Sequence, residues 1–284
     1  LGAMGGGMAR AARTAARGEV GIDVDPGREA EFRAGGGLAR EALPRVSAVA
    51  VVTLTGAQAE DALFGAAGAA GALAPGTVVL SCATMAPEQA RALAARVAAA
   101  GLAFLDAPIS GGAAKAEAGA LSVMASGSAE AFAKARPLLD ATAETVFDLG
   151  TEPGAGSAMK AVNQLLAGVH IAAMAEAVVF AAAQGIAPET VLEVIPRCAG
   201  TSWMFENRAP HVVEADYAPR SAVAIWPKDL GIVLDAARAA GAPVPLAPAA
   251  LARFTEAAGA GLAREDDAAV AKVYARGAGV TLPG

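Results

Sequence analysis

The sequence predicts an N-terminal α/β domain with a mostly parallel, doubly wound sheet, followed by an all-α domain. Two observations lead to this fold class. In the first half of the chain, short apolar runs typical of buried strands alternate with helical segments. After Pro153, long helical periods replace the strands. We therefore expect two domains, residues 1–152 and residues 153–284.

The first domain alternates helices and strands along the chain. In order, we expect a helix at 5–17, a strand at 20–24, a helix at 29–33, a strand at 49–54, a helix at 58–64, a strand at 77–81, a helix at 87–100, strands at 103–106 and 121–126, a helix at 129–139 and a strand at 145–149. The run AVAVVTLT at 48–55 shows the character of the buried strands. Such β-α-β alternation predicts parallel strands with helices on both faces of the sheet.

The second domain consists of helices separated by glycine and proline. We expect helices at 157–184, 188–199, 228–240, 245–258 and 266–275. The stretch 165–183 approaches the length of a membrane span. However, it is mostly alanine and contains His170 and Glu176, and a charged residue within a span costs several kcal/mol. We expect a helix buried in protein and no membrane partner.

Composition and charge argue against a disordered chain, a nucleic-acid-binding protein and a metal-binding protein. The chain is 55% hydrophobic and 18% charged, which is typical of a globular protein. Its net charge is −6 with no basic block, so we expect no nucleic-acid partner. Cys82 and Cys198 have no CxxC or Cys/His neighbours, so we expect no metal site. Two lone cysteines and the lack of a basic segment before an apolar run fit a cytoplasmic protein.

The first residues resemble part of a dinucleotide-binding glycine motif. In Gly-x-Gly-x-x-Gly, glycines let the backbone approach a pyrophosphate at a helix N-terminus. Gly2 and Gly5 match the second and third glycines, so we expect the first strand to precede Leu1. Asp23 follows Gly5 by eighteen residues, where a carboxylate can bond the ribose hydroxyls and repel a 2′-phosphate. With Val24 next and no arginine there, the pattern favours NAD and a Rossmann-type domain; the alternative is a glycine-rich turn with a surface aspartate.

A lysine at the start of the longest helix is a candidate acid/base. Lys160 falls in the first turn, where the positive helix terminus and burial both lower the pKa of an amine. Asn163 and Gln164 follow three and four residues later, so their amides share its face and can hold a substrate oxygen. The alternative is a solvated lysine at a domain edge.

Two further segments carry polar groups. Ser110, Gly111 and Gly112 follow the strand at 103–106 and offer a hydroxyl and close backbone N–H groups to a carboxylate, or form an ordinary loop. Lys228 adds a second cation near the cofactor or substrate, or is a solvated helix start. We expect His170 and His211 to be structural.

Together these segments resemble the β-hydroxyacid dehydrogenase family, which includes 3-hydroxyisobutyrate, tartronate semialdehyde and 6-phosphogluconate enzymes. The resemblance covers the whole chain and rests on LGAMG at 1–5, DAPISGG at 106–112, GAGSAMKAVNQ at 154–164 and PKDLG at 227–231. It implies that Lys160 is the catalytic lysine and that residues 110–112 bind the substrate carboxylate. The cofactor contacts it implies are Leu1, Gly2, Ala3, Met4, Gly5, Asp23, Leu54, Thr84 and Lys228.

One departure from the family pattern concerns the substrate. Members typically carry Asn four residues after the lysine, whereas this chain has Gln164, which argues against ordinary 3-hydroxyisobutyrate specificity. The segment 199–222 and the ending GVTLPG resemble a branch that oxidises four-carbon sugar acids at C2. The resemblance thus implies NAD-dependent oxidation of a small hydroxy acid.

Two alternatives stay open. One is another activity of the same family, a 3-hydroxyisobutyrate dehydrogenase or a tartronate or succinic semialdehyde reductase. The other is a non-catalytic NAD-binding sensor or scaffold, against which the joint presence of Lys160 and Ser110 argues. The helix at 157–184 is apolar around most of its circumference, so we expect a homodimer or homotetramer.

Overall fold

The computed structural model describes residues 1–15 and 19–283, and the chain divides into two compact units. Unit 1 is Leu1–Lys160 and unit 2 is Ala161–Gly284. The division falls within the 29-residue helix α7, Ala155–Ala183. Each unit has its own hydrophobic core, as is typical of a domain.

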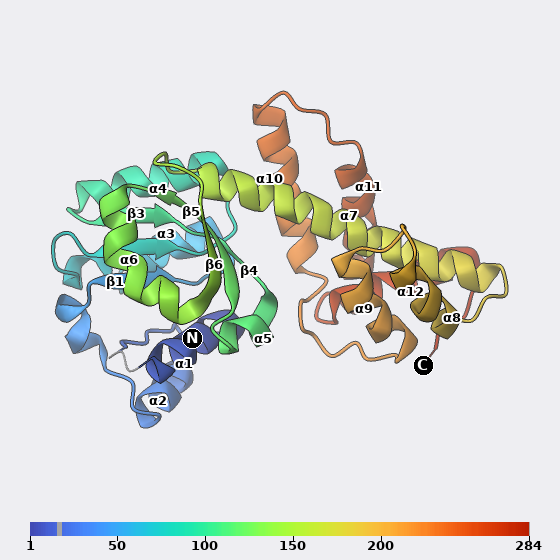
Figure 1. Cartoon of the computed structure of the whole chain (residues 1–284), viewed down its shortest axis with the longest axis horizontal. Helices are drawn as coiled ribbons and strands as arrows, with labels where there is room; N and C mark the ends of the chain where they lie inside the picture. The colour runs from blue at the N-terminus through green and yellow to red at the C-terminus, as the bar shows by residue number, and fades with distance from the viewer. Residues whose placement is uncertain (16–18, 284) are drawn as a thin grey trace. The chain divides into compact units, whose positions relative to one another are not determined.

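Unit 1 is built on a six-stranded sheet of order β1-β2-β3-β5-β4, with β6 also paired to β5 (Figure 1). Its strands are β1 Ala48–Val51, β2 Val78–Ser81, β3 Ala103–Asp106, β4 Ile109–Ser110, β5 Leu121–Gly127 and β6 Ala143–Asp148. The pairs β1–β2, β2–β3 and β5–β6 are parallel, whereas β5 runs antiparallel to β3 and β4. The sheet is therefore mostly parallel, as predicted.

Helices pack on both faces of this sheet. They are α1 Ala3–Thr14, α2 Pro26–Ala34, α3 Gly56–Phe64, α4 Pro87–Ala99, α5 Gly112–Glu117 and α6 Ala129–Thr142, with short 3₁₀ turns η1 Arg40–Arg45 and η2 Ala70–Ala72. Side chains of β2 alternate between two cores because successive residues of a strand point to opposite faces. Val79 packs in one core with α3 and α4, and Leu80 packs in the other with α1 and α6. Two cores on two faces confirm the doubly wound α/β class.

One predicted strand, at 20–24, is wrong. Val20 forms an isolated parallel bridge with Leu38, and residues 21–24 have no strand partner among the described residues. A strand needs a hydrogen-bonded neighbour, whereas Val20 and Ile22 line a cavity together with residues of β1. The strand expected before Leu1 stays a prediction. The helix expected at 5–17 is α1; residues 16 and 17 lie outside the described part of the chain.

Unit 2 is all helical, as predicted. Beyond α7 it contains α8 Pro188–Val194, η3 Ile195–Arg197, α9 Trp203–Val213, α10 Ile225–Ala239, α11 Leu246–Ala257, the π turn η4 Ala258–Leu262, η5 Asp267–Val270 and α12 Ala271–Ala278. Helix α9 was not among the helices predicted from the sequence, and Pro210 lies inside it. Ser202 caps it by accepting a hydrogen bond from the Phe205 N–H at 3.0 Å. The short elements β4 and α5 were likewise not expected.

Helix α7 is long and apolar enough to cross a membrane by length and composition alone, and half of its most apolar 18-residue window is buried in the protein. The same properties are typical of a helix in a protein core. Ile171 and Met174 of α7 are fully buried against other helices of unit 2. These contacts place this part of α7 in the core of unit 2.

We predict that Phe254→Ala destabilises unit 2. Phe254 is fully buried and stacks on Trp226, with ring centroids 5.4 Å apart. Removing a buried phenyl ring leaves a cavity and costs about 3–5 kcal/mol of the free energy of unfolding. Urea unfolding measures this loss. The control is Leu246→Ala, which alters an apolar side chain that is 65% exposed and should change the free energy by less than about 0.5 kcal/mol. Equal effects of the two substitutions would contradict the assigned core.

Candidate functional site

The glycine turn sits at the N-terminus of α1. Gly2 is the N-cap residue and has no side chain to occupy the N–H groups of the first turn, so these can face an anion. Gly5 faces the end of β1, since an added Cβ would lie 3.4 Å from the Cβ of Val52. The two glycines therefore sit as a dinucleotide motif requires, one at the helix N-terminus and one at a close helix–strand contact.

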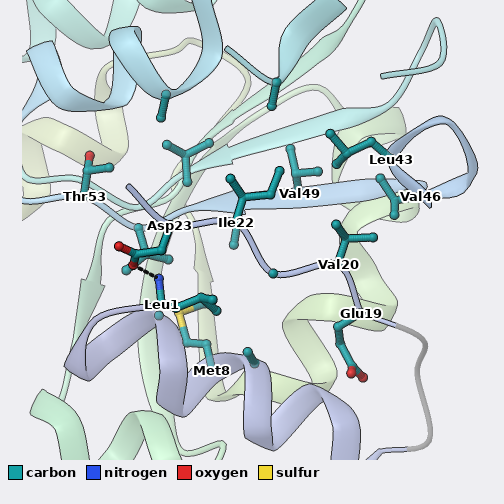
Figure 2. A pocket seen from close by; sticks show the side chains of 18 of the residues that line it. Leu1, Met8, Glu19, Val20, Ile22, Asp23, Leu43, Val46, Val49 and Thr53 are labelled. Carbon is teal, nitrogen blue, oxygen red and sulfur yellow. Dashed lines mark hydrogen bonds and ion pairs between the residues drawn. The ribbon is translucent and has the colours of Figure 1, made fainter. Parts of the chain in front are cut away.

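The Asp23 carboxylate lies beside this turn (Figure 2). Its Oδ2 accepts a hydrogen bond from the Leu1 amino nitrogen at 2.7 Å, and its Oδ1 accepts one from the Asp25 N–H at 2.9 Å. The Asp25 N–H donates to this carboxylate and the Arg28 guanidinium lies beside it. Both favour the ionised form, which can accept hydrogen bonds from ribose hydroxyls.

Arg28 is a residue that the sequence reasoning missed. Its Nη1 lies 3.8 Å from Asp23 Oδ2, and its Nε lies 3.7 Å from Asp25 Oδ2. A Cβ added to Gly2 would lie 3.6 Å from Nη1, so the guanidinium also borders the glycine turn. Its signal in the sequence is an arginine five residues after the aspartate, in the first turns of the following helix, α2, whereas the residue directly after the aspartate is Val24.

A cavity of about 1480 Å³ in unit 1 joins the glycine turn, the segment at 19–24 and β1. Figure 2 shows its two parts: Asp23 and Thr53 lie toward one side, and Val20, Leu43 and Val46 toward the other. The polar part suits the sugar and phosphates of a dinucleotide. Leu54 also lines the cavity, whereas Thr84 is half-buried in the loop after β2 and is not among the lining residues.

Lys160 lies beside the Ser-Gly-Gly loop. The side chain of Lys160 is buried, and its Nζ donates a hydrogen bond to the Ile109 carbonyl at 2.8 Å. Ile109 directly precedes Ser110, which ends β4. Gly111 and Gly112 follow with φ of 136° and 77°, values that favour glycine. Unit 1 thus brings the predicted lysine and the predicted carboxylate loop together.

Unit 2 groups the other predicted residues around a carboxylate that the sequence reasoning did not assign. Asp229 is 2% exposed, and its Oδ2 accepts a hydrogen bond from Gln164 Nε2 at 2.5 Å. Its Oδ1 forms an ion pair with Lys228 Nζ at 2.5 Å. The Asn163 amide donates to Gln164 Oε1 at 2.8 Å. Asp229 follows Lys228 in PKDLG, so its signal was present in a segment that had already been singled out.

The histidines and cysteines form no centre of their own. His211 Nδ1 lies 2.9 Å from Asp266 Oδ1, and both side chains are buried. Cys82 is buried and Cys198 is exposed, and both are free thiols. Within residues 1–15 and 19–283, no group of three or more His, Cys, Asp or Glu side chains could hold a metal ion.

Comparisons with known proteins cover both units. Residues 1–150 match the family model for the NAD-binding domain of 6-phosphogluconate dehydrogenase, and residues 154–274 match that for NADP-dependent 3-hydroxyisobutyrate dehydrogenase. L-Threonate dehydrogenases of Escherichia coli O6:H1 and Cupriavidus necator are 45% and 46% identical over the whole chain, which covers 95% and 96% of them. The crystal structure of 3-hydroxyisobutyrate dehydrogenase from Salmonella typhimurium is 46% identical, with a TM-score of 0.90 over 96% of this chain and 97% of that one.

We predict a strong preference for NAD over NADP that depends on Asp23. In Asp23→Ala, the repulsion of a 2′-phosphate is lost and Arg28 is released to pair with it. A charge-assisted hydrogen bond contributes about 1.5–3 kcal/mol, so the ratio of kcat/KM for NADP to that for NAD should rise about 10- to 100-fold.

The control for this prediction is the double variant Asp23→Ala/Arg28→Ala, which should lose most of that gain. Kinetics with both cofactors measure the ratio. An NADP preference in the unaltered protein would refute the role of Asp23, and an equal gain in both variants would refute that of Arg28.

Proposed function

The chain belongs to the β-hydroxyacid dehydrogenase family, with the 3-hydroxyisobutyrate dehydrogenases, and from this premise we propose that it oxidises L-threonate at C2 to the 2-oxo acid. It is an NAD-dependent dehydrogenase of small hydroxy acids. The names of the relatives at 45% and 46% identity support the four-carbon substrate. The single observation that carries the proposed chemistry is the buried Lys160 beside the Ser110 loop.

In this proposal, NAD supplies the hydride acceptor. Residues 1–5, Asp23 and Leu54 hold it in unit 1, with further contacts from Thr84 and Lys228. The fit rests on the glycine turn at the start of α1 and on the Asp23 carboxylate beside it, next to Arg28.

Lys160 is the proposed general base in the oxidation. Its Nζ takes the proton of the substrate hydroxyl, which lets the carbinol carbon release its hydride. The Ile109 carbonyl holds Nζ on the side of the Ser110 loop.

Two sets of polar groups orient the substrate in this proposal: the loop at 110–112, which precedes Lys160 in the sequence, and the amides at 163–164, which follow it. The Ser110 hydroxyl and the N–H groups of Gly111 and Gly112 bind the carboxylate. Gln164 and Asn163, one turn after Lys160 on α7, bind substrate oxygens. Gln164 Nε2 donates to Asp229 and Gln164 Oε1 accepts from the Asn163 amide, and the second lone pair of Oε1 suits a substrate hydroxyl.

We also propose a two-domain organisation with residues 1–152 binding cofactor and residues 153–284 forming the helical substrate and oligomerisation domain. The free thiols of Cys82 and Cys198 support a cytoplasmic location.

The substrate assignment predicts that, among small hydroxy acids, L-threonate gives the highest kcat/KM for NAD reduction. The panel includes D-threonate, L-erythronate, 3-hydroxyisobutyrate, L-serine and, in the reverse direction with NADH, tartronate and succinic semialdehydes. A higher kcat/KM for 3-hydroxyisobutyrate or a semialdehyde would assign the rival activity of the same family. Absence of turnover with all of them would favour a sensor or scaffold.

Replacing Lys160 should remove proton transfer and leave cofactor binding intact. We predict that Lys160→Ala lowers kcat by about 10²–10⁴, the usual contribution of a positioned acid/base. NAD affinity, measured by fluorescence titration, should stay nearly unchanged. Lys160→Arg should be almost as poor, since guanidinium stays protonated. The rise of kcat/KM with pH to a plateau, as the lysine loses its proton, should disappear in both variants; near-normal turnover of Lys160→Arg with an unchanged pH profile would refute the mechanism.

We predict a homodimer or homotetramer that uses α7. Val162, Leu166 and Phe180 are 53%, 49% and 65% exposed on this helix, although all three are apolar. Sedimentation at micromolar concentration should show an oligomer, and Leu166→Glu/Phe180→Glu should shift it toward monomer. The matched control is Val194→Glu, which changes an exposed apolar residue of α8. A monomer in the unaltered protein would contradict the prediction.

A further inference from the structure

A buried carboxylate at the end of β3 binds the start of α7. Asp106 is 0% exposed. Its Oδ2 accepts hydrogen bonds from the Gly154 N–H at 3.0 Å and the Ser157 N–H at 2.7 Å, and its Oδ1 accepts one from Ser157 Oγ at 2.7 Å. Three donors from one helix terminus therefore meet a single side chain of the sheet.

A second contact, three residues further along α7, fixes the same part of the helix. Lys160 Nζ bonds to the Ile109 carbonyl, and Ser157 bonds to Asp106, so each pair joins residues 51 apart in sequence. The segments 106–109 and 157–160 are therefore hydrogen-bonded to each other at their first residues and at their last residues. This pairing fixes both the rotation of the first helical turn and its position along the segment that leads to Ser110.

The surrounding backbone leaves this turn little freedom. The Gly156 N–H donates to Ser126 Oγ at 3.1 Å, and a Cβ on Gly156 would lie 2.4 Å from the Met124 carbonyl oxygen. Helix α7 therefore meets the sheet at backbone contact distance. A shift of the turn would break the Lys160–Ile109 bond along with the bonds to Asp106.

We propose that Asp106 is a positioning residue for the reaction: by binding the first turn of α7, it holds Lys160 at the carboxylate loop. The inference rests on the proposed function for the importance of Lys160 and goes beyond it in naming the group that sets its position. The hydrogen bonds of Asp106 provide this positioning, and its charge is not required.

The pKa of Asp106 distinguishes the contribution of its hydrogen bonds from that of its negative charge. Burial raises the pKa of Asp106 above its ordinary value, and the hydrogen bonds from Ser157 and Gly154 offset only part of that rise. A raised pKa in the folded state means that ionisation costs stability as the pH rises through that pKa. An amide in the same place would keep both backbone hydrogen bonds through its oxygen, while the Ser157 hydroxyl could accept from its nitrogen. Asp106→Asn therefore preserves the bonds and removes the charge.

The test compares Asp106→Ala with Asp106→Asn in the whole protein. Loss of the hydrogen bonds should lower kcat about 10- to 100-fold in Asp106→Ala, the scale of a misplacement of about 1 Å, with the Kd for NAD unchanged. Asp106→Asn should keep kcat within about threefold of the unaltered enzyme. Unchanged kcat in Asp106→Ala would overturn the inference, as would an equal loss in both variants.

A second readout reports on Lys160 directly, by its rate of labelling with trinitrobenzenesulfonate at fixed pH, measured by peptide mass spectrometry. The rate should rise several-fold in Asp106→Ala and stay near normal in Asp106→Asn. The matched control is Thr142→Ala, which removes a buried hydroxyl of α6 that bonds to Leu138 at 2.8 Å and should change neither kcat nor labelling. If Asp106→Ala fails to fold, Ser157→Ala removes one of the three bonds and should give the same two changes at smaller size; no change in it would overturn the inference.

The labelling experiment also separates this inference from the proposed function. If Lys160→Ala retained its kcat, the proposed chemistry would fail, and the position of Lys160 would be judged on labelling alone. Unchanged labelling in Asp106→Ala would then overturn the positioning role as well.

Discussion

The junction between the end of β3 and the start of α7 is the constraint on which the candidate site depends. Burying the Asp106 carboxylate is costly, and its three hydrogen bonds from Gly154 and Ser157 recover part of that cost only in one arrangement of the turn. Lys160 lies three residues after Ser157 on α7, so the orientation of this turn also sets where the Lys160 side chain points. The end of β3 therefore sets where the lysine lies, and the helical period places Gln164 one turn further along α7.

The polar residues of the two units are organised by different means. In unit 1, backbone groups make most of the contacts: a carbonyl holds Lys160, and two glycines of positive φ shape the loop after Ser110. In unit 2, side chains hold one another, with Asp229 binding Gln164 and Lys228 at once.

The incorrect prediction of a strand at 20–24 shows that the local sequence of one segment does not establish strand pairing. The run VGIDV has the apolar character of a strand, and Val20 and Ile22 do pack against one core of the sheet. Apart from the isolated bridge of Val20 to Leu38, it lacks a strand partner among the described residues, and it lines a cavity together with β1. Pairing is a property of two segments, so periodicity in one of them cannot establish it. Helix α9 is the converse case, a helix that forms although it was not predicted. The N-cap hydrogen bond of Ser202 and the burial of Phe205 stabilise it, and these contributions outweigh the destabilising effect of Pro210 inside the helix.

The sequence alone determined the α/β class, the order of nearly all helices and strands, and the candidates Lys160, Ser110 and Gln164. Hydrophobic period, glycine position and motif order are local properties, and they are visible in the chain itself. Only the tertiary structure decided that Asp106 caps α7, that Arg28 lies beside Asp23, and that Asp229 holds Gln164. Each of these contacts needs two segments to meet in space, at separations of 51 and 65 residues for Asp106 and Asp229. Arg28 is only five residues from Asp23, but its direction depends on how α2 leaves the aspartate, which spacing does not specify.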